Sequence, residues 1–415
     1  MYKKVIVFIA ACLLSTSFLL AQIDSSGISK NEKDTLIAID PDHSGNMDII
    51  DVYHHLFNKH NNPHGIIAGQ KNTNYHASLV PAVGYTLQTG WAGIISANVG
   101  FYTSNAENAN LSTALLNIEY TQFSQILLPL QTNIWSKNNK VNFQGDWRYY
   151  KYPQNTYGLG SNTTTDQANP VDYSYIRFYQ VAMSEIGRNM YLGGGYMLDY
   201  HWNISEEGNE DGSQSDFDKY GFKSKSISSG VSANFLYDSR KNPINPSKGF
   251  YANVSLRNNF TFLGSDNNSE TILIDVRKYI KPSKNSDNIL AFWSYNAFTL
   301  SGTPSYLDLP SNGWDTYNNT SRGYVQGRFR GQNMIYLESE YRFSLSRNKL
   351  FGGVVFANAE SFSEWPSNKF ETILPGGGVG LRLQINKHSK TNLGIDYGWG
   401  RNGSGGIFIN LGEVF

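Results

Sequence analysis

A basic, glycine-rich stretch of eleven residues, Ser321 to Gly331, carries the side chains best suited to binding carboxylates. It holds three arginines, three glycines and two aromatic residues. Such a stretch is too basic and too rich in glycine for an ordinary strand, so it predicts a loop. The guanidinium group of arginine pairs bidentately with a carboxylate. The stretch therefore indicates ion pairing with acidic residues elsewhere in the fold.

The segment that follows this loop supplies the acidic residues. One face of it holds Ile335, Leu337, Ser339, Tyr341, Phe343 and Leu345, and the other holds Tyr336, Glu338, Glu340 and Arg342. Alternation with a period of two is typical of a strand with one apolar and one polar face. We therefore expect the loop to fold back so that its arginines pair with Glu338 and Glu340.

The composition favours one large all-β unit. Aromatic residues make up 14% of the 415 residues, charged residues make up 16%, and the formal net charge is zero. A nucleic-acid-binding protein would carry a basic surplus, so that class is excluded. After residue 21 no run approaches the roughly 18 to 20 apolar residues of a membrane helix, which excludes helical spans.

The first 21 residues have the organisation of a secretory signal peptide. Two lysines precede the apolar run Val5–Leu20, and Ala21 offers a small residue for cleavage. A lipoprotein signal ending before Cys12 is the alternative, but the apolar run continues well past that cysteine. Because Cys12 is the only cysteine, we expect no disulfide in the mature chain.

Residues 22–75 are polar and are expected to form a short periplasmic segment. Oxygen-bearing residues with approximate EF-hand spacing are Asp40, Asp42, Ser44, Asp48 and Asp51. Asp51 replaces the usual glutamate, so a weak calcium site and an Asp-rich turn before a short helix both stay open. Otherwise we expect no metal and no cofactor. The histidines nearby are irregularly spaced and favour a solvated linker.

From residue 76 to 415 the chain consists of segments of about ten residues with two-residue alternation, separated by turn residues. Sixteen segments can be counted. Residues 112–121 and 125–135 are poorly separated and could be one strand, so a barrel of fourteen strands is also allowed. In lipid, only strands paired all round leave no backbone group unsatisfied. The sequence therefore predicts an all-β, transmembrane antiparallel β-barrel of sixteen strands.

The lengths of the connections predict the orientation of the barrel. An even number of strands places both ends of the barrel's chain on one side, here the periplasm. Long polar connections then face outward, at 152–171, 203–224, 263–269 and 301–332. Connections on the other side are short, and the connection 361–375 is interpreted as a longer inner exception.

Several motifs resemble the barrel of the BamA/TamA family, the bacterial surface-antigen superfamily of outer-membrane assembly and translocation proteins. They are Arg322-Gly323-Tyr324, Gly327-Arg328-Phe329-Arg330, Glu340-Tyr341-Arg342, Asp238-Ser239-Arg240, Ile395-Asp396-Tyr397-Gly398 and the terminal segment 406–415. In that family an Arg-Gly-(Phe/Tyr) motif at the tip of the sixth outer loop tucks into the lumen. The segment count independently makes 301–332 the sixth outer connection.

The resemblance implies a latch between this loop and the barrel wall. The latch motif would be Arg322, Gly323, Tyr324, Gly327, Arg328, Phe329 and Arg330, with Glu338, Glu340, Asn358 and Glu360 as partners. Asn358 and Glu360 stand where the family usually has Asp and Gly, so the partner of Arg322 stays open. The family's C-terminal assembly signal would be carried by Ile409, Leu411, Gly412 and Phe415, with Phe415 as an outward anchor of the last strand.

Functional expectations follow from the resemblance. They are a barrel in the outer membrane of a Gram-negative bacterium that assists protein or lipid insertion or export, surrounded by lipid and inserted by the barrel assembly machinery. Residues 22–75 are too short for a POTRA module, which suggests a separate periplasmic accessory protein. The alternative is a plugged or low-conductance pore, or a structural barrel. No nucleophile elbow is present, so we expect no enzyme.

Overall fold

The computed structural model describes residues 46–49, 51–52, 76–104, 109–240, 242–283, 286–387 and 390–415. The predicted signal peptide lies outside the described residues, as does most of the segment 22–75. Of the five calcium-ligand candidates, only Asp48 and Asp51 are described. The division into a signal peptide, a periplasmic segment and a barrel therefore stays a prediction for the first two parts.

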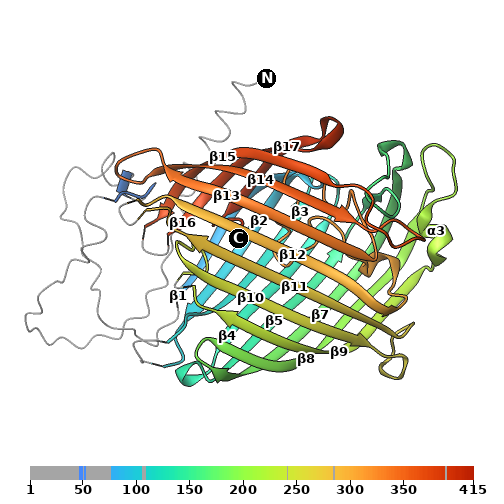
Figure 1. Cartoon of the computed structure of the whole chain (residues 1–415), viewed down its shortest axis with the longest axis horizontal. Helices are drawn as coiled ribbons and strands as arrows, with labels where there is room; N and C mark the ends of the chain where they lie inside the picture. The colour runs from blue at the N-terminus through green and yellow to red at the C-terminus, as the bar shows by residue number, and fades with distance from the viewer. Residues whose placement is uncertain are drawn as a thin grey trace, which may run out of the picture.

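The described chain forms one antiparallel sheet that curls into a nearly closed barrel (Figure 1). Its strands are β1 (His76–Thr86), β2 (Gly90–Phe101), β3 (Ser112–Thr121), β4 (Ile126–Trp135), β5 (Val141–Lys151), β6 (Gln154–Thr156), β7 (Asn169–Gly187), β8 (Met190–Glu206), β9 (Lys225–Asp238), β10 (Gly249–Asn259), β11 (Ser269–Ile280), β12 (Ile289–Gly302), β13 (Asn333–Ser344), β14 (Phe351–Phe362), β15 (Leu374–Asn386), β16 (Thr391–Trp399) and β17 (Gly405–Leu411). Each long strand pairs with the next one along the chain, and the three-residue β6 only extends the pairing at the start of β7. Without β6, the seventeen strands are the sixteen predicted from the sequence.

Strands β3 and β4 are separate, which makes the alternative of fourteen strands wrong. The chain turns at residues 122–125, where the backbone N–H of Thr121 donates to the carbonyl of Gln125 at 3.1 Å. The Thr121 hydroxyl also donates to the Gln125 side chain at 3.0 Å. The turn contains no Gly, Pro, Asn or Asp, and this is why it was hard to recognise in the sequence.

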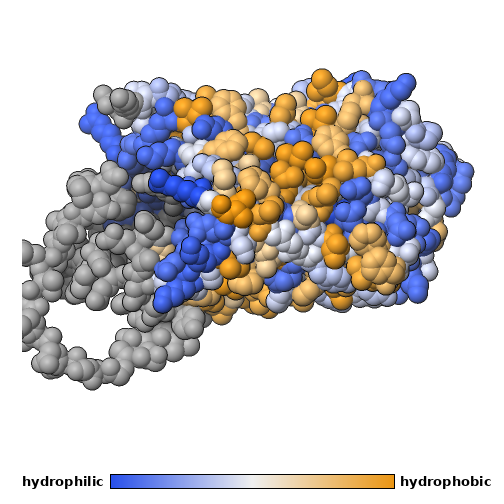
Figure 2. Space-filling model, turned by 60° about the horizontal axis from the view of Figure 1, so that its bottom comes forward, coloured by the Kyte–Doolittle hydropathy of each residue, from blue (hydrophilic) through white to orange (hydrophobic). Residues whose placement is uncertain are grey.

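The alternation along the strands separates an apolar outer surface from a polar interior. On β13, Leu337 is 53% exposed, while its neighbours Tyr336 and Glu338 are buried inside. Figure 2 shows an apolar band around the middle of the molecule with hydrophilic residues toward both ends. Within the described part of the chain, no helix has the length and apolarity needed to cross a membrane. The apolar band is the surface that a barrel presents to lipid.

The four longest connections, residues 152–168, 207–224, 303–332 and 363–373, lie at one end of the barrel. The Glu364 carboxylate accepts hydrogen bonds from the backbone N–H groups of Ser161 and Asn162, at 2.9 and 3.0 Å. The carboxylate of Asp216 accepts from the N–H of Leu159 at 3.0 Å. The prediction that the connection after β14 lies on the inner side is wrong, because alternating strand direction places it with the outer loops.

The barrel has one discontinuity, which we call the seam, between β1 and β17. The two strands are neighbours, but among the described residues the paired ladders end at β1–β2 on one side and at β16–β17 on the other. The last strand has only 7 residues, whereas β7 on the opposite wall has 19. The seam is therefore the place where strand edges are least protected.

We predict that Gly193→Ala destabilises the barrel. A Cβ atom at Gly193 would lie 1.9 Å from the carbonyl oxygen of Ala182 in the adjacent strand. Such overpacking costs about 1–3 kcal/mol, and it should lower the temperature at which the folded band disappears in heat-modifiability gels. Gly93→Ala is the matched control, because a Cβ there meets nothing within 4 Å. Equal transition temperatures for the two variants would contradict the packing of β7 on β8.

Candidate functional site

The long connection between β12 and β13, residues 303–332, folds back into the lumen, and we call it loop L6. It begins with the short 3-10 helix η5 (Tyr306–Asp308). At its tip Ser321, Arg322 and Tyr324 are buried, Arg322 being 1% exposed. The loop therefore occupies the interior that the alternation of the strands leaves polar.

Arg322 is surrounded by three carboxylates from two strands. Its Nη1 donates to Asp396 of β16 at 2.5 Å, and its Nη2 donates to both Glu338 and Glu340 of β13. The guanidinium group also lies 3.7 Å from the ring centroid of Phe356. One side chain of L6 thus joins two strands of the wall that are not neighbours.

Two more arginines and one more carboxylate complete a buried charge cluster. Arg382 pairs with Asp396 at 2.5 Å and with Glu413 at 2.9 Å, and Arg342 pairs with Glu340 at 2.7 Å. Three cations therefore face four carboxylates, which leaves one negative charge if all are ionised (+3 − 4 = −1). Because every side chain of the cluster is nearly sheltered from water, removing one member leaves buried charge without a partner.

The backbone at the tip of L6 needs glycine. Gly323 has a φ of +116°, and a Cβ there would lie 2.5 Å from the carbonyl oxygen of Trp399. The serine before the arginine, Ser321, also has a positive φ of 71°, and its hydroxyl donates to the buried carboxylate of Glu360. The Asn358 amide donates to the backbone carbonyl of Arg322 at 3.0 Å.

The sequence-predicted partners of the latch thus divide by role. Glu338 and Glu340 contact the guanidinium group of Arg322, whereas Asn358 and Glu360 bind the backbone and the serine beside it. Glu360 therefore does not form an ion pair with Arg322. Asp396 was missed as a partner, although it lies in the Ile395–Gly398 motif. Asp396 lies between Ile395 and Tyr397, which are outward and exposed. Because side chains alternate along a strand, this position could have assigned Asp396 to the lumen.

The other residues of the latch motif anchor L6 at separate points. The Tyr324 hydroxyl donates to the carbonyl of Pro375 at 2.6 Å and accepts from the N–H of Arg401 at 2.8 Å. Arg328 donates to the hydroxyl and carbonyl of Thr163 at 2.8 and 2.7 Å. Arg330 donates to the carbonyls of Tyr306, Leu307 and Leu309. Gly327 has a φ of +78° in the turn, and Phe329 packs edge-on against Tyr324.

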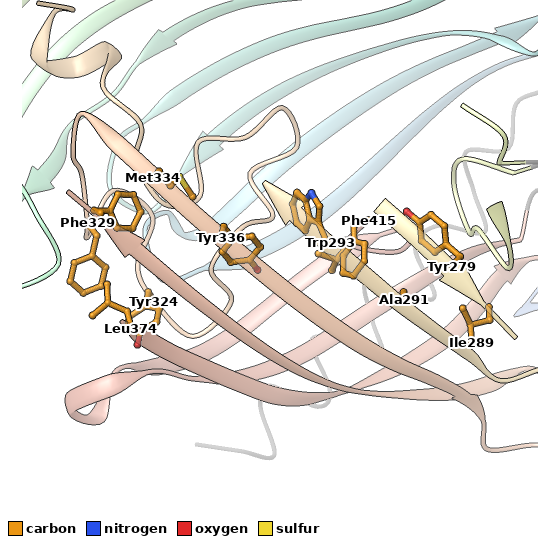
Figure 3. Close-up of a cluster of buried hydrophobic side chains, with 12 residues drawn as sticks. Tyr279, Ile289, Ala291, Trp293, Tyr324, Phe329, Met334, Tyr336, Leu374 and Phe415 are labelled. Carbon is orange, nitrogen blue, oxygen red and sulfur yellow. The ribbon is translucent and has the colours of Figure 1, made fainter. Parts of the chain in front are cut away.

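The C-terminal tail after β17 turns into the lumen, so the prediction of Phe415 as an outward anchor is wrong. The turn occurs at Gly412, which has a φ of +91°. Phe415 stacks on Trp293 with the ring centroids 5.1 Å apart (Figure 3), and its carbonyl accepts from Arg342 at 2.9 Å. Leu411 is exposed on the outside and Ile409 lies on the same face of β17. A buried arginine and a tryptophan therefore hold the chain end inside.

The wall opposite the latch carries a second network of charges. The Asp199 carboxylate pairs with Arg177 at 3.2 Å and with Arg257 at 2.6 Å. The base of L6 reaches this side, where Ser228 donates to Asp308 at 2.6 Å. L6 is thus held between two walls of the barrel.

Asp48 and Asp51, the two described calcium-ligand candidates, bind Lys387. Both Asp51 oxygens accept from Nζ of Lys387 at 2.8 Å, and Asp48 accepts from the backbone N–H of Lys387 at 3.0 Å. Burial alone would raise the pKa of Asp51, but its interactions with Lys387 and its hydrogen bonds with Asp48 together lower the pKa. Among the described residues no group of three His, Cys, Asp or Glu side chains is arranged to hold a metal ion.

A sixteen-stranded barrel with an arginine-tipped loop inside it defines a class of membrane barrels. Residues 68–415 match the Omp85 superfamily domain, and the chain belongs to this superfamily.

Solved structures share the fold. BamA from Haemophilus ducreyi, solved without POTRA domains 1–3, superposes with a TM-score of 0.54 and 17% identity over 81% of this chain and 69% of that one. CdiB from Acinetobacter baumannii has a TM-score of 0.54 and 11% identity over 82% of this chain and 60% of its own length. No curated protein matches the chain.

We predict that Arg322→Ala and Arg322→Lys both destabilise the folded barrel. Removing one partner from a buried charge cluster costs about 3–5 kcal/mol, and a lysine ammonium cannot reproduce the fork that contacts three carboxylates. Urea unfolding in lipid vesicles measures the change. Arg401→Ala, on an exposed loop arginine, should stay within about 0.5 kcal/mol of the wild type. If the urea midpoint of Arg322→Ala equals that of Arg401→Ala, the role of Arg322 as a latch is contradicted.

We predict that Phe415→Ala loosens the C-terminal tail. The substitution removes a buried aromatic ring, a change that costs about 3–5 kcal/mol in a packed core. The fluorescence of Trp293 would change, and protease should cleave the tail faster in the folded barrel. Phe351→Ala, which removes an outward ring that is 51% exposed, serves as the control. Equal protection of the tail in the two variants would contradict its placement in the lumen.

Proposed function

We propose that this protein lies in the outer membrane of a Gram-negative bacterium and assists the insertion or translocation of polypeptides through its seam. The observation that carries the proposal is the unpaired boundary between β1 and β17 in an otherwise continuous sheet. A client segment would pair with the exposed strand edge, as an added strand does at any free sheet edge. The apolar outer surface would let the paired segment pass sideways into lipid.

The latch supports this proposal because it is built onto the wall beside the seam. Ser404, in the turn between β16 and β17, donates to the carbonyl of Gly323 at 2.7 Å. Asn319 of L6 donates to the carbonyl of Val414 at 2.8 Å. We infer that L6 holds the short last strand from inside, so that β1 and β17 can separate while the rest of the barrel keeps its shape.

The same loop argues against an open pore. The tip of L6 crosses the interior, and the cavities near the seam are small, measuring about 250 Å³ and about 400 Å³. The cavity of about 250 Å³ is lined by residues of β1 to β5, the tip of L6 and β17, among them Glu119, Tyr150 and Phe408. A cavity of this size beneath a buried loop favours a closed lumen over a wide aqueous passage.

The proposal predicts that closing the seam with a disulfide stops client insertion. Leu87 and Gly406 face each other across the seam, because a Cβ atom at Gly406 would lie 2.2 Å from Cδ2 of Leu87. With cysteines at both positions, oxidation should abolish accelerated folding of a urea-denatured outer-membrane protein into vesicles that contain the barrel, and reduction should restore it.

A cysteine pair within the continuous wall is the matched control. Asn133 of β4 and Gln144 of β5 lie opposite each other in the ladder, so a disulfide there should leave insertion unchanged. The proposal is contradicted if clients insert as fast with the oxidised seam as with the reduced seam, or if the wild type does not accelerate insertion.

The alternative function, a conducting pore, gives a different result in planar bilayers. We predict low conductance for the wild type and a large increase after deletion of residues 315–331, which removes the tip of L6. A large, steady current through the wild-type protein would favour the pore and count against the closed lumen.

A further inference from the structure

The short connections at the end of the barrel where the chain enters are strongly basic. They comprise residues 102–111, 136–140, 188–189, 239–248, 281–288, 345–350 and 387–390. The described residues of these connections include ten Lys and Arg against one acidic residue, Asp287. The connections at the opposite end contain seven Lys and Arg against eleven Asp and Glu. The charge of the chain as a whole is zero, so this asymmetry is a property of one end, which we call the basic rim.

Several cations of the basic rim are exposed and unengaged. Lys137, Arg188, Lys248 and Arg347 are exposed and form no ion pair among the described residues. Three further rim lysines, Lys140, Lys281 and Lys349, have a distant or a shared partner. Lys140 pairs with Glu185 at 3.5 Å while its side chain stays 72% exposed, and Lys281 and Lys349 share Asp287. These cations come from five separate connections, and the four without an ion pair make no charge contact within the described residues that would require their common sign.

One rim cation shows what the surface binds. Lys387 receives a short acidic turn of the chain, with its ammonium group on Asp51 and its backbone N–H on Asp48. The same turn is tied to the neighbouring connection by a hydrogen bond from the N–H of Met47 to the carbonyl of Asn348 at 2.9 Å. The occupant is thus a polypeptide that presents two carboxylates, spaced three residues apart, and adds a backbone contact.

We propose that the basic rim is a docking surface for an acidic protein partner, whose carboxylates bind the remaining rim cations as Asp48 and Asp51 bind Lys387. The turns extend beyond the ends of the strands, so their charges face the aqueous phase and surround the opening of the barrel. A partner bound there would stand at the entrance to the lumen and beside the C-terminal tail, since the backbone N–H of Glu413 in the tail donates to the carbonyl of Ile244 in the β9–β10 turn at 3.2 Å. The inference rests on the proposed function in one respect, which is that the basic rim faces the periplasm.

Fluorescent poly-L-glutamate is the probe that tests the surface, with the full-length barrel in phosphatidylcholine nanodiscs. Lys137→Glu, Arg188→Glu, Lys248→Glu and Arg347→Glu are combined in one variant. We expect saturable binding to the wild type that weakens with salt, and binding to the variant that is weaker by about tenfold or more. The variant's heat-modifiability should match the wild type, because the four side chains make no hydrogen bond or ion pair with the described residues of the latch or the seam.

The control variant reverses four exposed cations at the opposite end, Lys219, Lys223, Lys369 and Arg401, and should bind poly-L-glutamate as the wild type does. Equal losses in the two variants would show attraction by net charge alone and overturn the proposal. Rim-dependent binding of phosphatidylglycerol vesicles without binding of poly-L-glutamate would also overturn it, in favour of a lipid surface. Because the measurement needs no client, a failure of client insertion leaves its outcome unaffected.

Discussion

The burial of the Arg322 guanidinium group is the constraint on which the rest of the interior depends. A charge taken out of water is tolerated only where partners satisfy it, and here Glu338, Glu340 and Asp396 do so. The cluster fixes L6 across the lumen and ties β13 to β16. It also explains why the loop needs Gly323, because the arginine reaches its partners only if the backbone lies directly against the carbonyl of Trp399.

The C-terminal tail extends the same cluster to the end of the chain. Glu413 binds Arg382, and Phe415 lies on Trp293 beside Arg342. The last strand is therefore held by its tail from within more than by ladder bonds to β1. The sheet can therefore open between β1 and β17 while the other fifteen strand pairings stay intact. A barrel whose ladder was closed all round would have no such free edge. This arrangement is the physical basis of the proposal that the seam can open.

Charge is distributed in the barrel in two independent ways. In the lumen, acidic and basic side chains are matched within the latch cluster and within the network around Asp199. At the turns they are separated by end, so that one rim is basic. Matched charges inside stabilise a fixed structure, whereas unmatched charges at a surface attract a partner of opposite sign.

The sequence by itself determined the barrel and the outline of its site. A period of two repeated in sixteen segments, with glycine and polar residues between them, specifies strands with one apolar face, and the basic loop before Glu338 and Glu340 specifies its partners. The sequence did not determine the third carboxylate, the contacts of Glu360 with Ser321 and of Asn358 with the backbone of Arg322, or the inward turn of Phe415. Period and composition report only which face of a strand a residue occupies. Which residues meet across a lumen depends on the curvature and closure of the sheet, and these arise only in the tertiary structure, when strands distant in sequence face one another.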